Sequence, residues 1–193
     1  MTSTVLWAIV GYLLGSIPFG LLLTRAVGTN IRAVGSGNIG ATNVLRSGRK
    51  DLALATLLLD GAKGALAVGL ARHFAGEQAA VIAGFAAFGG HLYPLWLRLR
   101  GGKGVATMLG VALAGFWPAG VAALLVWAVA AAATRYSSVG GMLAGIAAPL
   151  AALALGRPDW ALPLACMTAL LILKHADNIA RLRAGTESRI GIK

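Results

Sequence analysis

Long apolar segments separated by short polar ones dominate the hydrophobic pattern of the chain. A helix needs about 20 residues to cross a hydrocarbon core that is about 30 Å thick. Runs that approach or exceed this length occupy residues 3–24, 51–73, 78–97, 105–134, 139–156 and 160–176. The pattern therefore predicts an all-α polytopic membrane protein.

The run 105–134 allows two interpretations. As one helix it would be about 45 Å long, which is too long for one crossing and short for two. Pro118 lies near its middle, and a proline ends or kinks a helix. The chain therefore has either six spans, with one long tilted helix, or seven spans, with a turn near Pro118.

The basic residues favour seven spans. The chain holds 17 Lys and Arg residues against 6 Asp and Glu, a net charge of +11. With seven spans and the N-terminus outside, all the basic residues fall in inside loops except Lys63, Arg72 and Arg157, as the positive-inside rule requires. This layout explains the basic excess without a nucleic-acid partner. We expect residues 1–193 to form a single membrane-embedded domain, because the loops are too short to hold another.

Small residues in the apolar runs predict close helix packing. Gly11 and Gly15, like Gly141 and Gly145, are four residues apart, a spacing that lets two helices approach closely. Cys166, the only cysteine, lies in an apolar run, and we expect it to be buried.

Three polar, glycine-rich segments border the apolar runs. They are Gly35–Asn43, then His91–Pro94 leading to Gly101–Gly104, then Lys174–Asn178 leading to Gly185–Glu187. Backbone N–H groups free of Cβ crowding can curl around an anion. With Lys, Arg and Asn nearby, the segments favour phosphate binding, and seven spans put all three on the cytoplasmic face.

Two nucleotide-binding motifs are excluded. Gly35, Gly37 and Gly40 have the spacing of the dinucleotide fingerprint, but no buried strand precedes them. The segment around Lys103 is not a Walker A motif, because Gly104 stands where Ser or Thr is required.

Charged residues also occur inside the second run. Asp60 and Lys63 are three residues apart near its centre, where each alone would cost roughly 2.5–3.5 kcal/mol. They can pair along the helix. Their role stays open between function and a structural clamp, and His91 is expected to be a structural hydrogen-bonding residue.

The three segments, in this order and with this topology, resemble the PlsY family of bacterial acyl-phosphate-dependent glycerol-3-phosphate acyltransferases. The resemblance implies transfer of a fatty acyl group from acyl phosphate to the 1-hydroxyl of sn-glycerol 3-phosphate. The products would be lysophosphatidic acid and phosphate, in the first step of phospholipid synthesis. It also implies no metal or other cofactor, a place in the lipid bilayer of the bacterial cytoplasmic (inner) membrane, and functional coupling to the enzyme that makes acyl phosphate.

The resemblance also implies a set of site residues. The first segment would cradle the acyl-phosphate head, with Ser36 and Arg46 on the glycerol phosphate, and Lys103 would hold phosphate. The full substrate-binding set is Ser36, Gly37, Asn38, Ile39, Gly40, Ala41, Thr42, Asn43, Arg46, Gly102, Lys103, His175, Asn178 and Glu187. Ala176-Asp177 departs from the larger basic-acidic pair that is more usual in the family, which leaves the role of Asp177 open.

His175, Asn178 and Ser36 are the candidate catalytic residues. By residue type His175 is a candidate base, a phosphate oxygen of a substrate is a rival proton acceptor, and Ser36 is a weaker candidate as covalent nucleophile. An alternative function is a membrane transporter of phosphate or a lipid-phosphate anion. The absence of internal repeats and the clustering of polar segments on one face oppose it.

Overall fold

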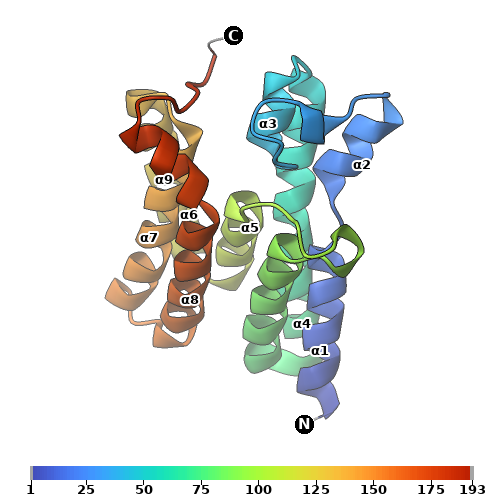
Figure 1. Ribbon diagram of the computed structural model, residues 1–193. Coiled ribbons are helices and arrows are strands. Elements are labelled where there is room, and N and C mark those ends of the chain that lie inside the picture. Colours follow the sequence, from blue (N-terminus) through green and yellow to red (C-terminus); the bar gives the residue numbers. More distant parts are fainter. Residues whose placement is uncertain (1, 192–193) are drawn as a thin grey trace.

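The computed structural model describes residues 2–191, and all the regular secondary structure in that range is helical (Figure 1). The helices are α1 (Thr2–Gly15), α2 (Phe19–Ala26), α3 (Ala41–Arg46), α4 (Lys50–Leu92), α5 (Val105–Gly115), α6 (Trp117–Thr134), α7 (Ser137–Ala154), α8 (Pro158–Lys174) and α9 (Ala176–Arg183). Short 3₁₀ turns, η1 and η2, occupy Ile31–Ala33 and Leu95–Leu97. Several described segments are long and apolar enough to cross a membrane, namely Thr4–Ala26, Lys50–Leu97, Trp117–Thr134 and Ser137–Ala154.

Helix α4 is two helices joined at Gly76. This residue has a φ of 80° and a ψ of −173°, a conformation that only glycine adopts readily. The chain reverses there, so the two halves of α4 lie side by side (Figure 1). A Cβ on Gly84 would lie 2.8 Å from Cγ2 of Val68, which shows how closely the halves pack. The two apolar runs 51–73 and 78–97 are thus separate helices, as their spacing predicts.

The run 105–134 is also two helices. Phe116 is extended, with a φ of −143° and a ψ of 92°, and separates α5 from α6. Pro118 lies in the first turn of α6, where its missing N–H has no helical partner to lose. The predicted turn near Pro118 is therefore confirmed.

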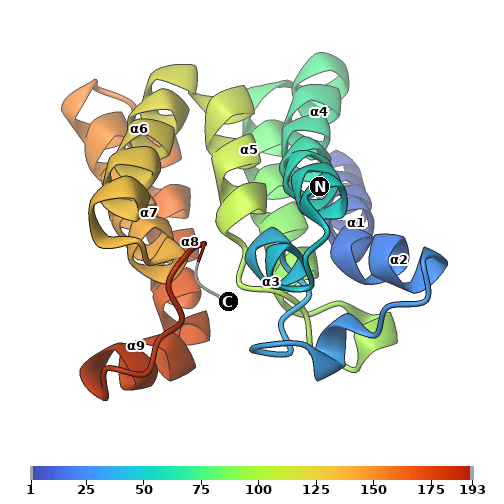
Figure 2. The same cartoon turned by 90° about the horizontal axis from the view of Figure 1, so that it is seen from above.

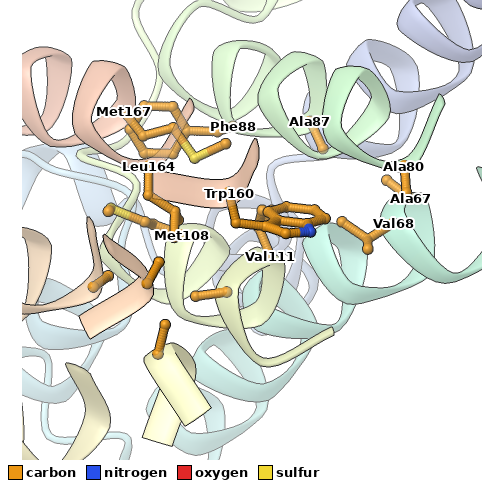
Figure 3. Packing of buried hydrophobic residues seen from close by; sticks show 14 of the residues in the cluster. Ala67, Val68, Ala80, Ala87, Phe88, Met108, Val111, Trp160, Leu164 and Met167 are labelled. Atoms are coloured by element: carbon orange, nitrogen blue, oxygen red, sulfur yellow. The ribbon is translucent and has the colours of Figure 1, made fainter. Parts of the chain in front are cut away.

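Small residues bring the helices into backbone contact. A Cβ on Gly11 or Gly15 of α1 would overlap the carbonyl groups of Ala83 and Ala87 in α4. The central core is built around Trp160 of α8, which is fully buried and lies close to Val68 and Val111 (Figure 3). Cys166, expected to be buried, is exposed.

The helices form two groups when the molecule is viewed from above (Figure 2). Helices α1 to α5 make one group and α6 to α9 the other. The short helices α2, α3 and α9 gather at one end of the bundle, while the N-terminus and the reversal of α4 lie at the opposite end (Figure 1).

Glu77 ties the two groups together at the end opposite the short helices. Its carboxylate accepts hydrogen bonds from Arg72 at 2.7 Å, Arg157 at 2.8 Å and Trp160 at 2.6 Å. Arg72 also donates to the carbonyl of Gly115 at 2.8 Å. These contacts connect α4, the α5–α6 break and the start of α8.

Candidate active site

A cavity of about 140 Å³ lies between the two helix groups, since its lining residues come from α3, α4 and α5 and from α6, α7 and α9. Because α3 and α9 contribute to it, the cavity lies toward the end where the short helices gather. All three glycine-rich segments contribute to its wall, as the sequence predicts. Its polar part is lined by Ser36, Asn38, Gly40, Ala41, Thr42, Asn43, Arg46, Asp60, His91, Lys103, Gly104, Ser137, Ser138, His175, Asn178 and Glu187. Its apolar part is lined by Leu57, Val105, Ala106, Leu109, Leu124 and Trp127.

Asn43 organises the first segment. Its side-chain Nδ2 donates to the carbonyls of Val34 at 2.9 Å and Ile31 at 3.1 Å. Its Oδ1 accepts from the backbone N–H of Ser36 at 3.1 Å and lies 3.4 Å from Oγ of Ser36. Asn43 is 1% exposed. The amide therefore replaces the regular backbone bonds that this irregular loop lacks.

The same loop presents free backbone donors. From Asn38 to Thr42 no backbone N–H has a hydrogen-bond acceptor among the described residues. Gly40 is extended and α3 begins at Ala41. Oγ1 of Thr42 lies 2.9 Å from Oγ of Ser137, which joins this loop to α7 across the cavity. Successive unpaired N–H groups of this kind are suited to an anion.

A chain of hydrogen bonds connects the second and third segments. Lys103 donates to Oδ1 of Asn178, and Nδ2 of Asn178 donates to Glu187 at 2.6 Å. Glu187 also accepts from Ser138 at 2.8 Å and from Arg181 at 2.7 Å. The carboxylate of Glu187 therefore fixes the rotamer of Asn178, and Asn178 in turn holds the ammonium group of Lys103.

Lys103 lies among charged side chains of both signs, with cations in the majority. Burial, followed by the nearby charge of Arg181, lowers the pKa of Lys103 to about 8. Arg46 also lowers this pKa, and the carboxylates of Glu187 and Asp177 raise it. The three cations outnumber the two carboxylates, and like charges in a partly buried site repel one another. The arrangement therefore favours a negatively charged ligand.

His175 is held in one neutral form. Its Nδ1 lies 2.8 Å from the carbonyl of Leu171. A carbonyl can only accept, so Nδ1 carries the proton and Nε2 keeps its lone pair. Burial lowers the pKa of His175 to about 4, so the ring is uncharged at neutral pH.

Three predicted binding residues do not line the cavity. Ile39 is 2% exposed and packs in a small core with Leu21 and Val44. Gly37 turns the loop with a φ of 68°. Gly102 is buried against the ring of His91, whose Nε2 a Cβ there would overlap. These residues shape the loops, while the other predicted residues line the cavity.

Ser36 lacks a partner that could activate it as a nucleophile. Its Oγ is hydrogen-bonded to Oδ1 of Asn43 at 3.4 Å, and within residues 2–191 no other hydrogen-bond partner of this hydroxyl is found. A carboxamide oxygen is not a general base, so covalent catalysis by Ser36 is disfavoured.

Sequence reasoning missed Ser137 and Ser138. Both line the cavity from the first turn of α7, and Ser138 bonds to Glu187. Serines are common at the start of a helix, so nothing in the local sequence distinguishes these two as site residues. Asp60 carried a signal, as a charged residue in an apolar run, but nothing in the sequence placed it at the cavity. His91 lines the cavity as part of the second glycine-rich segment.

Comparison with known proteins identifies the family. The family model described as "Glycerol-3-phosphate acyltransferase" matches residues 5–185. A glycerol-3-phosphate acyltransferase of Rhodopseudomonas palustris (strain BisB5) is 54% identical over 186 residues, covering 96% of this chain and 95% of the relative. One of Nitrobacter winogradskyi is 55% identical, covering 95% of this chain and 94% of the relative.

Solved structures agree with the sequence comparison. A crystal structure of PlsY, described as an integral membrane glycerol 3-phosphate acyltransferase in its glycerol 3-phosphate form, superposes with a TM-score of 0.93. It is 37% identical, and the match covers 98% of this chain and 96% of PlsY. The lysophosphatidic acid form gives a TM-score of 0.91 at 36% identity, with the same coverage. With its fold, its membrane-type helices and its sequence all matching, the chain belongs to the glycerol-3-phosphate acyltransferase family.

Proposed function

We propose that this protein is a membrane-embedded enzyme that acylates the 1-hydroxyl of sn-glycerol 3-phosphate to give lysophosphatidic acid, with fatty acyl phosphate as the donor. Family membership supports the reaction, as do the glycerol 3-phosphate and lysophosphatidic acid forms of the related PlsY. The observation that carries the proposal is the cavity itself. One part of it is cationic and rich in free N–H donors, and the other is apolar.

The polar part suits two phosphate groups. The free N–H groups from Asn38 to Thr42 would hold the head of the acyl phosphate, and Arg46 and Lys103 would hold the glycerol phosphate. Two bound phosphates repel each other, and charge-assisted hydrogen bonds in a site that excludes water offset this repulsion. The two reactants are then held in attack geometry, which lowers the barrier further.

The apolar part suits the acyl chain. Leu57 of α4 and Leu124 of α6 lie at its wall and are themselves 38% and 42% exposed. In a membrane protein, apolar side chains with this exposure face lipid as readily as core. A fatty chain could therefore lie between the helices while its phosphate head reaches the polar part.

The hydroxyl proton is best accepted by a substrate phosphate. With its pKa near 4, His175 is a weak base at neutral pH, whereas a phosphate monoester dianion has a pKa of about 6. The hydroxyl oxygen forms the new ester bond to the acyl carbon, the bond from that carbon to phosphate breaks, and the proton goes to a phosphate oxygen. Nε2 of His175, which can only accept, would then bind the other hydroxyl of glycerol 3-phosphate and orient the substrate.

We further propose seven spans with the N-terminus outside, a single domain, and the site on the cytoplasmic face of the bacterial inner membrane. The breaks at Gly76 and Phe116 support this count. So does the contact of Arg72 and Arg157 with Glu77, which directly follows the reversal of α4 at the end opposite the short helices (Figure 1). A site on the cytoplasmic face could receive acyl phosphate directly from the enzyme that makes it.

Purified protein in detergent tests the reaction. Given palmitoyl phosphate and glycerol 3-phosphate, it should release lysophosphatidic acid and phosphate in equal amounts. A parallel assay with palmitoyl-coenzyme A tests the donor, since turnover with the thioester alone would reject acyl phosphate. Failure to form product from either donor would reject the acyl transfer. Activity without a sealed compartment excludes transport as the basis of turnover.

A further inference from the structure

Asp60 and Lys63 form a buried ion pair in the first half of α4 that the proposed reaction leaves without a role. Their side chains are 4% and 2% exposed, and Nζ of Lys63 lies 2.8 Å from Oδ1 of Asp60. Lys63 also donates to the carbonyl of Ile17 at 2.8 Å. Asp60 lines the cavity, so the pair reaches from the bundle interior to the wall of the site.

Lys63 connects to the first glycine-rich segment. Ile17 lies at the break between α1 and α2, so the bond from Lys63 fixes the start of α2. Helix α2 then supports the segment, because Gly20 has no Cβ and packs directly against the carbonyl of Ile39. The loop that carries the free N–H groups and leads to Arg46 therefore rests on an element anchored by Lys63.

Asp60 connects to the second segment through His91. Nδ1 of His91 lies 3.7 Å from Oδ1 of Asp60 and has no hydrogen-bond partner among the described residues. The Nε2 edge of the ring lies against Gly102, whose N–H donates to the carbonyl of His91 at 3.0 Å. Lys103 is the next residue. The carboxylate of Asp60 thus faces the ring against which the lysine loop packs, at a distance beyond that of a direct hydrogen bond.

We propose that Asp60 and Lys63 are positioning residues that hold the first and second glycine-rich segments in register, so that Arg46 and Lys103 face the same anion. A buried ion pair contributes little to stability when compared with apolar side chains of the same size. This pair connects to the first segment through Ile17 and α2 and to the second through His91, and its effect is on their placement. The inference rests on the proposed function, because its assay measures the proposed formation of lysophosphatidic acid. The rate of the wild-type protein in that assay tests the proposed function separately.

Single substitutions measure the effect. Asp60→Asn and Lys63→Met each keep the size of the side chain and break the pair. We expect kcat/KM for glycerol 3-phosphate to fall on the order of 10- to 100-fold, because small misplacements of binding groups have effects of this size. KM should rise and kcat should fall together. Asp51→Asn is the matched control, because Asp51 is in the same helix, is 62% exposed and pairs with Arg49 outside the cavity. Its kcat/KM should equal that of the wild type.

Two further variants separate positioning from folding. Asp60→Glu keeps the charge and should retain more activity than Asp60→Asn. The double variant Asp60→Leu/Lys63→Met replaces the pair by apolar side chains. It should unfold at the wild-type temperature or above and still show the reduced kcat/KM. The proposal is overturned if this double variant has wild-type kinetics, if Asp60→Glu is no better than Asp60→Asn, or if Asp51→Asn loses as much activity as Asp60→Asn.

Discussion

Lys103 donates a hydrogen bond to Oδ1 of Asn178, which lies 75 residues farther along the chain. The bond joins the loop before α5 to helix α9, and therefore one helix group to the other. Because Asn178 is itself held by Glu187 at 2.6 Å, the lysine is oriented before any substrate arrives. Such preorganised cations stabilise developing negative charge without the cost of reorganising.

Lys103→Ala should lower kcat/KM about 10- to 100-fold, with normal membrane insertion. A hydrogen bond to a charged group is worth about 1.5–3 kcal/mol, and in the proposed reaction the lysine binds a substrate phosphate. Arg46→Ala should have a similar effect. The check is the initial rate of lysophosphatidic acid formation in detergent, with Lys50→Ala as a control on an exposed lysine at the same end of the bundle. Near-wild-type turnover in Lys103→Ala would refute the proposal that Lys103 binds a substrate phosphate.

The pH dependence of kcat/KM should reflect the titration of Lys103. The pKa of Lys103 is lowered to about 8, and the charged form binds phosphate, so kcat/KM should fall as the pH rises through about 8. Arginine stays charged throughout this range, so Lys103→Arg should remove that fall. Burial lowers the pKa of His175 to about 4, so we expect no change in kcat/KM from the titration of this histidine between pH 6 and 8. A wild-type profile that stays level to pH 10 would contradict the lysine assignment.

Asn43→Asp should disable the first segment. The substitution keeps the acceptor for Ser36 but turns a carboxylate oxygen toward the carbonyls of Ile31 and Val34, which now lack a donor. Each unsatisfied buried group costs about 1–3 kcal/mol. We expect a lower unfolding temperature and a KM for acyl phosphate raised by at least tenfold, a change of about 1.4 kcal/mol. The control is Asn30→Ala, which removes only the cap on Arg32 in η1 and should leave KM unchanged.

Acid should weaken the protein through Glu187. Burial would raise the pKa of this carboxyl, but its hydrogen bonds from Asn178, Arg181 and Ser138 outweigh burial and lower the pKa below 4.5. A depressed pKa contributes stability that is present above the unfolded-state value and is lost as the pH falls through the folded-state value. The wild type should therefore unfold at a higher temperature than Glu187→Gln at pH 7, and the difference should shrink below pH 4.5. If the wild type and Glu187→Gln differed in unfolding temperature by the same amount at pH 7 and below pH 4.5, this assignment would be contradicted.

Glu77→Gln should lower stability without changing the chemistry. The carboxylate is 41% exposed, so solvent screens its ion pairs and the expected loss is about 1 kcal/mol. For a chain of this size that corresponds to roughly 2–4 °C in unfolding temperature. The kcat at 25 °C should be unchanged, because the cavity lies at the other end of the bundle. Asp159→Asn, which removes a contact to Arg157 alone, should shift the temperature less.

The sequence predicts the larger features of the fold because they follow from strong physical constraints. A run as long as 105–134 cannot be one simple crossing, and the structure breaks it at Phe116, two residues before Pro118. Glycine-rich segments next to basic residues indicate where anions can bind, and the cavity brings these segments together. Cys166 was wrongly expected to be buried, because in a membrane protein an apolar position can face lipid.

The finer features depend on contacts between distant residues. Nothing local shows that Ile39 belongs to a core or that Ser138 reaches Glu187. Each of these roles depends on where another element lies after packing. Family resemblance supplied the predicted site residues. The structure separates those that line the cavity from those, such as Gly102, that shape the neighbouring loops without lining it.

The position of the cavity between the two helix groups links occupancy to thermal stability. Glu77 joins the groups at one end, and at the other an anion bound in the cavity, between lining residues of both groups, would serve as a removable bridge. A ligand that binds only the folded state raises stability by RT ln(1 + [L]/Kd). Heating the protein with candidate anions would therefore rank inhibitors by melting shift alone, without any acyl donor in the assay.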